Sequence, residues 1–500
     1  MTLGEPAATS PRRGAVRNNV SRHFEGATVD RFTGDWVTQN ATMDALLENS
    51  LCKLRARSCQ LVGSDGYAAG AENLVVSNVV GEEGFGLKVR AKNKRGGPDK
   101  KASAAVEAAW KEFGKPENYT VTGDVGEHEL DCISLRSIFR KGGSMVRKVR
   151  GFRDSRFRYA LQGLDMDLLD PTYYESERRI SMSVEKDDWG RVQRYWLLDS
   201  LPVNRWFGYE SHRGRRAFAA DEIVHSYIRE EIDQSQGKPW LTPVISRLRQ
   251  LHGYEEAEVI AARAHASKIV FFETSPESPS AGYQGEGEDD WGNIRMDGSP
   301  GSGENLPPGV SANFIDPTHP NGNYPDFRKG VLRGIAAGII TNYNTLAQDL
   351  EGVNYSSIRQ GVLSERDLWK LIQRWYILKN KTPIFSDWLR FALMSGQIPG
   401  YDVTDYDRLN FPSFQGRRWG WVDPDKDSKA DERRLKNRLT SHQRLARQRG
   451  EDFDEILDEV EQDAQNAEGR NMEAQMDLFL DMVPQPQTAE EDAESEVATM

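Results

Sequence analysis

Three consecutive segments decide the fold: PDFRKGVLRGIAAGII (325–340), TNYNTLAQDLEGVNYSSIRQ (341–360) and GVLSERDLWKLIQRWYILK (361–379). In the first segment apolar residues recur every four positions, which predicts a helix with one apolar face: Phe327, Val331, Ile335 and Ile339. A second helix is predicted over about 357–380, with an aromatic stripe that includes Trp369. The polar loop between them, 341–356, contains no catalytic set of side chains. The stretch therefore predicts a loop held between two helices.

A further long helix is predicted over 242–271. Thr242 is a good N-cap, Pro243 suits the first helical position, and the second half is rich in alanine. About 30 residues at a rise of 1.5 Å give a helix of roughly 45 Å. Small side chains suit a helix that packs against copies of itself, although an ordinary core helix has the same pattern.

The residues before this helix mix helical and strand-like patterns. Helical spacing covers 40–80, 101–114 and 131–150, whereas alternation typical of strands covers 84–92 and most of 160–226. Ile180–Leu198 is predicted to be a β-hairpin that turns at Asp187–Gly190. The predicted class is α+β and mainly helical, with several domains because 500 residues exceed one simple core.

The acidic charge of the chain is concentrated at its C-terminal end. From Glu451 onward there are 17 acidic residues and one base, Arg470, so the first 450 residues carry +4 of a total of −12. A local basic stretch runs from Arg136 to Arg158. It is either a solvated surface or subunit contact, or a weakly specific signal for nucleic-acid contact. No apolar run reaches 18 residues, so we expect no membrane-spanning helix and no membrane partner.

Motifs for common enzyme chemistries do not occur. The sequence lacks a phosphate-binding G-x-x-x-x-G-K-[ST] loop, a G-x-S-x-G elbow, an H-E-x-x-H motif and an EF-hand loop. The three cysteines, Cys52, Cys59 and Cys132, lack zinc-ligand spacing and suit reduced thiols, and the eight histidines are scattered. We therefore expect no cofactor, no metal and no catalytic residues.

Several stretches, in this order along the chain, resemble the lambda-type portal proteins of tailed bacteriophages. They are LRARSCQLVGSDGYAAGAENLVVSNVVG (54–81), VEKDDWGRVQRYWL (184–197), AFAADEIVHSYI (217–228), QGKPWLTPVISRLRQLHGYEEAEVIAARAHAS (236–267), PDFRKGVLRGIAAGI (325–339), NYSSIR (354–359) and WGWVDPDKDSKA (419–430). The family often has asparagines before Tyr67-Ala68, where this chain has Gly63–Gly66. The shared order over nearly the whole chain carries the resemblance, rather than any single motif.

The resemblance implies a portal-like fold assembled as a ring, usually of twelve subunits. The implied regions are a flexible N-terminal arm (1–30), a wing (31–240 with 357–435), a stem of two helices (241–272 and 325–340), a clip (273–324), a tunnel loop (341–356) and a crown with an acidic disordered tail (436–500).

The implied role is a channel at one capsid vertex, through which double-stranded DNA is packaged and ejected. The implied partners are the terminase large subunit, head–tail connector proteins and the major capsid or scaffold protein, with assembly in the host cytoplasm and a final place in the virion. The candidate DNA-facing residues of the tunnel loop are Thr341, Asn342, Asn344, Gln348, Asn354 and Arg359. Arg359 is the exception among them, since an arginine at this position is more typical of a salt bridge or cap within the subunit than of DNA contact. The candidate docking residues of the clip are Glu286, Glu288, Asp289 and Asp290.

Two other functions stay open on sequence alone. One is a DNA-processing enzyme with a composite metal site that no motif reveals. The other is a head scaffold or connector protein without a channel.

Overall fold

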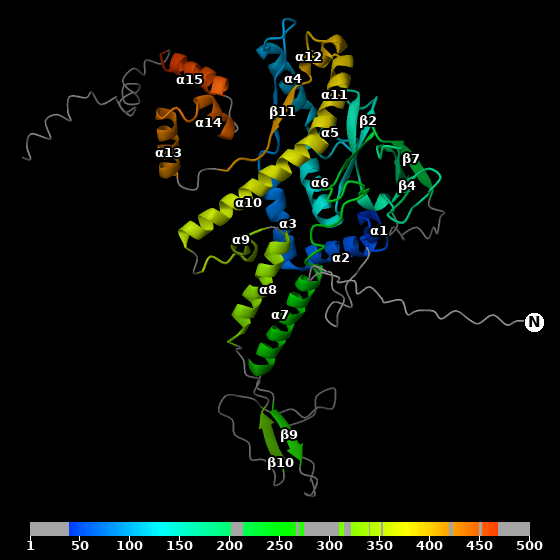
Figure 1. Cartoon of the computed structure of the whole chain (residues 1–500), viewed down its shortest axis with the longest axis vertical. Helices are drawn as coiled ribbons and strands as arrows, with labels where there is room; N and C mark the ends of the chain where they lie inside the picture. The colour runs from blue at the N-terminus through cyan, green and yellow to red at the C-terminus, as the bar shows by residue number, and fades with distance from the viewer. Residues whose placement is uncertain are drawn as a thin grey trace, which may run out of the picture.

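The computed structural model describes residues 40–201, 214–266, 270–274, 310–314, 322–339, 341–351, 354–419, 424–449 and 453–468. They form a body of helices and small sheets, from which a helical hairpin projects (Figure 1). Within this described part, no helix has both the length and the apolar character needed to span a membrane. Helices predominate, as the sequence predicts.

The first third of the body is built from six helices: α1 (Met43–Glu48), α2 (Leu51–Ser64), α3 (Gly66–Val79), α4 (Lys100–Phe113), α5 (Pro116–Tyr119) and α6 (Glu127–Lys141). The predicted helix over 131–150 is wrong in its second half. Helix α6 ends at Gly142, which has a left-handed φ of +86° and packs against the backbone of Gly237. A Cβ at this position would collide with that backbone, and the chain continues as strand β2.

Three small sheets complete the body, and all of their strand pairs are antiparallel. One has the order β3-β2-β8, from Tyr159–Leu164, Ser144–Arg150 and Ile223–Ser226. Another has the order β4-β5-β6-β7, from Ile180–Ser181, Val184–Lys186, Val192–Leu198 and Arg215–Ala219. The third pairs β1 (Gly86–Val89) with β11 (Pro412–Gln415). The predicted hairpin over 180–198 is confirmed from Val184 onward, as β5 and β6, and Gly190 in its turn has a φ of +75°. Its first residues instead form the separate strand β4, which pairs antiparallel with β5.

One long helical segment contributes to the two largest hydrophobic cores of the described residues. Helix α10 (Tyr355–Tyr376) contributes Trp369, Ile372 and Tyr376 to the first core, together with α3, α6 and the start of the projecting hairpin. Helix α11 (Thr382–Met394) contributes Trp388 and its neighbours to the second core, with α4 and β2. The two helices are joined by a π-helical turn, η4 (Ile377–Lys381).

The π-helical turn places a fully buried lysine between two carboxylates. Lys381 Nζ lies 2.5 Å from Glu127 Oε1 and 2.9 Å from Asp131 Oδ2, both on α6. The Tyr376 hydroxyl donates to Asp131 Oδ1 at 2.9 Å. Burial lowers the pKa of Lys381, but Asp131 and Glu127 outweigh this effect and hold it above its ordinary value. Lys381 therefore remains charged and ties the junction of α10 and α11 to α6.

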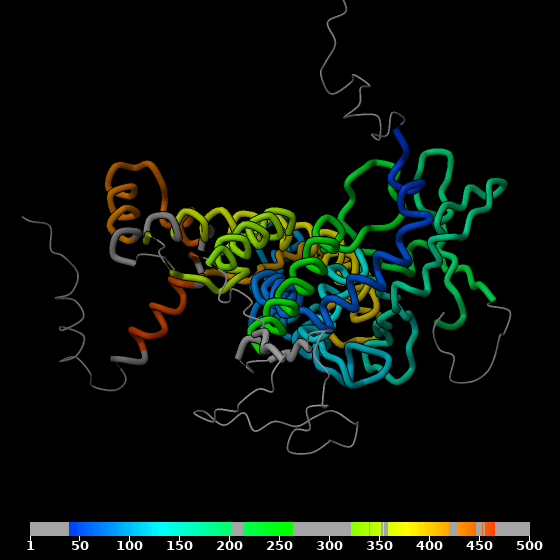
Figure 2. The backbone as a smooth tube through the Cα atoms, turned by 90° about the horizontal axis from the view of Figure 1, so that it is seen from below, coloured from blue at the N-terminus to red at the C-terminus, as the bar shows by residue number. Residues whose placement is uncertain are grey.

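The projecting hairpin consists of α7 (Ile245–Ala266) and α8 (Tyr324–Ile339), which run side by side (Figures 1 and 2). Glycines of α8 face α7: a Cβ at Gly338 would collide with Val244, and one at Gly334 would displace Arg247. Further along, Tyr254 packs on Phe327 with ring centroids 4.9 Å apart. The close approach explains why α8 carries glycine at four-residue spacing, although glycine weakens an isolated helix.

Strands β9 (Val270–Thr274) and β10 (Val310–Phe314) pair antiparallel beyond the hairpin. The helix predicted over 242–271 is therefore wrong at its end, because Val270 and Phe271 belong to β9. At the other end of the chain, α12 (Tyr406–Leu409) precedes β11, and α13 (Pro424–Lys436), α14 (His442–Arg449) and α15 (Phe453–Glu468) follow it. These last three helices lie on the opposite side of the body from β4 and β7, in both views (Figures 1 and 2).

Replacing Lys381 by methionine leaves Glu127 and Asp131 buried without their counter-charge. We expect Lys381→Met to lower the free energy of unfolding of the body by about 3–5 kcal/mol, since breaking a buried ion pair costs this much. Urea denaturation followed by tryptophan fluorescence measures the change. Lys379→Met is the matched control, because Lys379 is exposed on the same turn. Equal midpoints for the two variants would contradict a stabilising role for the buried lysine.

Candidate functional site

The connection between α8 and α10 is the candidate functional site, and it is more ordered than the sequence predicts. The predicted loop over 341–356 contains a short helix, α9 (Tyr343–Ala347), and α10 begins at Tyr355. Leu346 of α9 is buried in the first core, so it draws α9 onto α3 and α8. The first half of the connection is therefore part of the body.

One buried carboxylate, that of Glu365 on α10, holds the start of the connection. Glu365 Oε1 accepts the Asn342 backbone N–H at 2.7 Å and the Thr341 hydroxyl, and Oε2 accepts the Thr345 hydroxyl at 3.1 Å. These contacts satisfy polar groups at the start of α9. The first N–H groups of a helix have no hydrogen-bond acceptor within the helix. Glu365 is a residue that sequence reasoning did not identify. It occupies the apolar stripe of α10 four residues before Trp369, and an acid in such a stripe is the signal that could have found it.

A second carboxylate, that of Asp349, holds the far end of α9. Asp349 Oδ2 accepts the Tyr343 hydroxyl at 2.6 Å, and Oδ1 accepts the Glu351 backbone N–H at 3.0 Å. Burial and the hydrogen bond to Asp349 raise the pKa of Tyr343 to about 12, so the phenol keeps the proton that it donates. Lys329 on α8 lies 3.8 Å from the same carboxylate. Asp349 thereby connects the end of α9 back to α8.

The predicted DNA-facing residues lie in two different settings. Thr341 and Asn342 turn toward α10, where Thr341 donates to Glu365 and Asn342 lies against Gly361. Asn344 is half-buried, and Arg359 is half-buried with an interaction inside the chain. Gln348 and Asn354 are exposed, together with Leu350 at 69% exposure. Among the residues of the connection whose burial the structure describes, those of the second half that are exposed, Gln348, Leu350, Glu351 and Asn354, lie within 348–354, a segment that we call the tip.

The predicted docking residues Glu286, Glu288, Asp289 and Asp290 lie outside the described residues. The structure describes only the strands on either side of them, β9 and β10. In this strand pair Val270 lies opposite Phe314, and Thr274 lies opposite Val310. The intervening segment therefore begins and ends at neighbouring positions.

The basic stretch from Arg136 to Arg158 is largely neutralised within the chain. Arg150 bridges Asp221 at 2.6 Å and Asp387 at 2.9 Å. Other members of the stretch form ion pairs as well: Arg140 with Glu72, Arg147 with Glu222, Lys148 with Asp387 and Arg156 with Glu112. These pairs favour the structural interpretation of the stretch over contact with nucleic acid.

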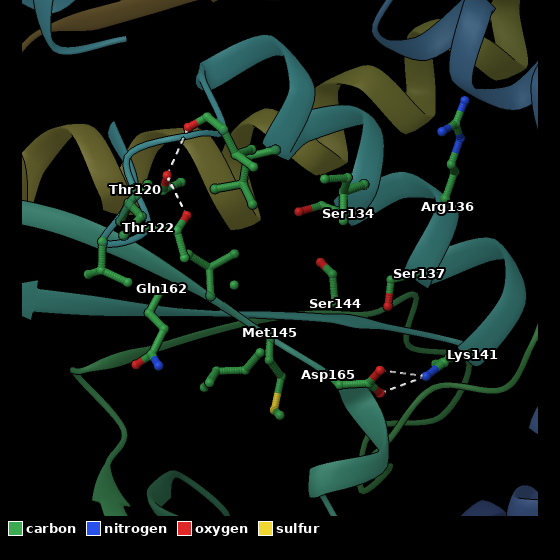
Figure 3. Close-up of a pocket in the computed structure, with 18 of the residues that line it drawn as sticks. Thr120, Thr122, Ser134, Arg136, Ser137, Lys141, Ser144, Met145, Gln162 and Asp165 are labelled. Atoms are coloured by element: carbon green, nitrogen blue, oxygen red, sulfur yellow. Dashed lines mark hydrogen bonds and ion pairs between the residues drawn. The ribbon is translucent and has the colours of Figure 1, made fainter. Parts of the chain in front are cut away.

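A cavity of about 680 Å³ lies between α6 and strands β2 and β3 (Figure 3). Its polar lining includes Thr120, Ser134, Ser144 and Gln162, and Lys141 at its edge is held by Asp165 at 2.6 and 2.8 Å. No histidine or cysteine lines it. Across the described ranges, no group of three or more His, Cys, Asp or Glu side chains is placed to hold a metal ion. The carboxylate of Asp165, which lines the cavity, is held in an ion pair with Lys141.

Comparison with known proteins places the chain in a family. The family model described as phage portal protein, lambda family, matches residues 30–373. The "Probable portal protein" of Halomonas phage phiHAP-1 is 30% identical over 452 residues, covering 89% of this chain and 86% of the relative. Portal protein B of Escherichia phage lambda is 22% identical, covering 91% of this chain and 90% of its own length.

Among solved structures, a chain from the neck of an empty gene transfer agent particle matches with a TM-score of 0.43 and 12% identity, covering 80% of this chain and 93% of that chain. This likeness is too weak to support an argument about assembly. The family match over more than half of the sequence, together with the Halomonas phage relative, decides the assignment: the chain belongs to the lambda family of phage portal proteins.

Proposed function

We propose that the chain is one subunit of a ring, of twelve copies by analogy with its family, that forms the DNA channel at one vertex of a phage capsid. The observation that carries the proposal is the α8–α9–α10 connection, whose tip has polar and acidic side chains and no lysine or arginine, in a chain of this family. Double-stranded DNA would pass the tip during packaging and ejection.

The charge around the tip supports a conduit. Each lysine or arginine that binds a phosphate adds a salt-dependent attraction, which would slow a moving duplex. Residues 341–354 contain no lysine or arginine. Gln348 and Asn354 are exposed and uncharged, so they can touch DNA without holding it, and the exposed Glu351 would repel phosphate.

The regions of the chain receive the following roles in this proposal. Helices α7 and α8 are the stem, residues 273–324 the clip, residues 341–356 the tunnel loop, residues 31–240 with 357–435 the wing, and residues 436–500 the crown. The terminase large subunit docks on the clip during packaging, and head–tail connector proteins replace it later. The wing contacts the major capsid or scaffold protein. The ring assembles in the host cytoplasm and remains in the virion.

The purified protein should assemble into rings with a central opening. We expect a particle mass of about twelve times the 56.5 kDa subunit, and ring-shaped projections by negative-stain microscopy. A monomer at high concentration, or a solid particle without an opening, would contradict the channel proposal. A monomer that cleaves DNA with Mg²⁺ would instead support the enzyme alternative.

Shortening the tip at residues 350–354 should leave rings intact and impair the packaging or retention of DNA. The contacts of Glu365 and the burial of Leu346 lie outside the deleted part, so the subunit should still fold. Packaging efficiency and DNA retention in assembled particles measure the effect. Leu350→Ser at full length is the control. Normal packaging by shortened rings would show that the tip is not the tunnel loop.

Reversing two clip acids, Asp289→Lys with Asp290→Lys, should weaken docking of the terminase or connector. A basic partner surface would lose attraction and gain repulsion, and we expect about tenfold weaker binding with slower association. Binding of the purified partner to immobilised rings measures it. Glu461→Lys with Asp463→Lys makes the same change of charge on α15, in the predicted crown. If both double variants dock equally, the clip acids are only solvated surface residues.

A further inference from the structure

The exposed face of α8 next to the loop carries two cations whose charge the loop offsets. Lys329 and Arg333 are four residues apart and therefore lie on the same face of the helix. Residues 341–354 contain two acids, Asp349 and Glu351, and no base. The charges of Lys329 and Arg333 thus balance those of the two acids, while the third cation of α8, Arg328, lies over the Tyr324 ring.

Each of the two cations contacts the connection directly. Lys329 Nζ lies 3.8 Å from Asp349 Oδ2, and the Arg333 guanidinium lies over the Tyr343 ring, 5.5 Å from its centre. Tyr343 in turn donates its hydroxyl to Asp349 at 2.6 Å. Asp349 therefore acts on Lys329 through charge, and on Arg333 by orienting the ring on which Arg333 rests.

The ion pair is placed where a phosphate could compete with it. The Lys329 side chain is 31% exposed and that of Asp349 is 17% exposed. A part-exposed pair at this distance is weak and is screened by salt. A phosphodiester oxygen of a passing duplex could therefore replace Asp349 at Lys329, but only by displacing a charge that is already there.

We propose that Lys329 and Arg333 form a latent phosphate-binding site, and that Asp349 masks it so that the channel wall does not hold DNA. The inference rests on the proposed function, because it requires this face of α8 to line the DNA path. It assigns Asp349 a role beyond holding α9: this carboxylate sets how strongly the wall attracts a duplex.

Neutralising Asp349 should convert the wall into a DNA-binding surface. The probe is a fluorescein-labelled duplex of about 30 base pairs, titrated with assembled rings at several salt concentrations and followed by anisotropy. We expect Asp349→Asn rings to bind at least about tenfold tighter at low salt. The slope of log affinity against log salt should steepen by about one for each additional phosphate that the wall neutralises.

Asp367→Asn is the matched control. Asp367 lies on α10 and pairs with Lys370 at 3.6 Å, with both side chains largely exposed, so this change also removes one carboxylate and frees one lysine. Its rings should bind within about twofold of the unmodified rings, because one exposed ion pair away from the channel adds little. If Asp349→Asn and Asp367→Asn rings bind DNA equally, the masking role is overturned.

Lys329→Met tests the other half of the pair. In the Asp349→Asn background it should remove most of the increase in affinity, and an increase that persists would overturn the assignment to Lys329. In the unmodified background it should change affinity little, because the lysine is already masked. If Asp349→Asn fails to assemble, a clear loss of affinity in this single variant still overturns the masking role, because it would mean that Lys329 already binds DNA.

Failure of the masking role can be distinguished from failure of the proposed channel function. Unmodified protein that forms no ring contradicts the proposed function. Rings that form and package DNA normally, but respond equally to the two asparagine substitutions, contradict only the masking role.

Discussion

The contact of Lys381 with Glu127 and Asp131 is the constraint on which the rest of the body depends. It fixes the point where α10 becomes α11, and each of these helices supplies the large side chains of a different core. A buried cation surrounded by Trp110, Tyr119, Phe85 and Phe414 is stable only with its carboxylates in place. The connection between α8 and α10 is hydrogen-bonded to Glu365 of α10. The position of the connection therefore depends on how the junction of α10 and α11 places α10.

Carboxylates perform two distinct tasks around this connection. Glu365 is buried, and its carboxylate accepts hydrogen bonds from three donors, so it fixes the local backbone conformation. Asp349 is nearer the surface and divides its oxygens among a phenol, a backbone N–H and a lysine. The difference in exposure explains why one can only shape the loop, while the other can also influence what approaches it.

The parts of the fold that follow from local spacing could be predicted from the sequence. Helix α8 and most of α10 result from apolar residues three and four positions apart, and the hairpin at Val184–Leu198 from alternation around Asp187–Gly190. The end of α6 could not be predicted, because Gly142 acts through its contact with the distant Gly237. Helix α9 and the role of Glu365 were not predicted because they also depend on a contact between distant residues. The polar groups at the start of α9 are hydrogen-bonded to Glu365, which is 20 or more residues away in the sequence. A connection between two helices was thus predictable from local spacing, but the orientation of Thr341 and Asn342 toward α10 depends on partners that no local pattern specifies.

The π-helical turn at Ile377–Lys381 sets the angular phase between α10 and α11. Successive residues of an α-helix are rotated by about 100°, so removing one residue from the turn would swing the aromatic face of α11 away from its core. Trp388 and its neighbours would then point in a different direction from the one that the second core requires. Natural variants of this protein should therefore tolerate changes of side chain at Leu378 or Lys379 much more readily than any change in the length of this segment.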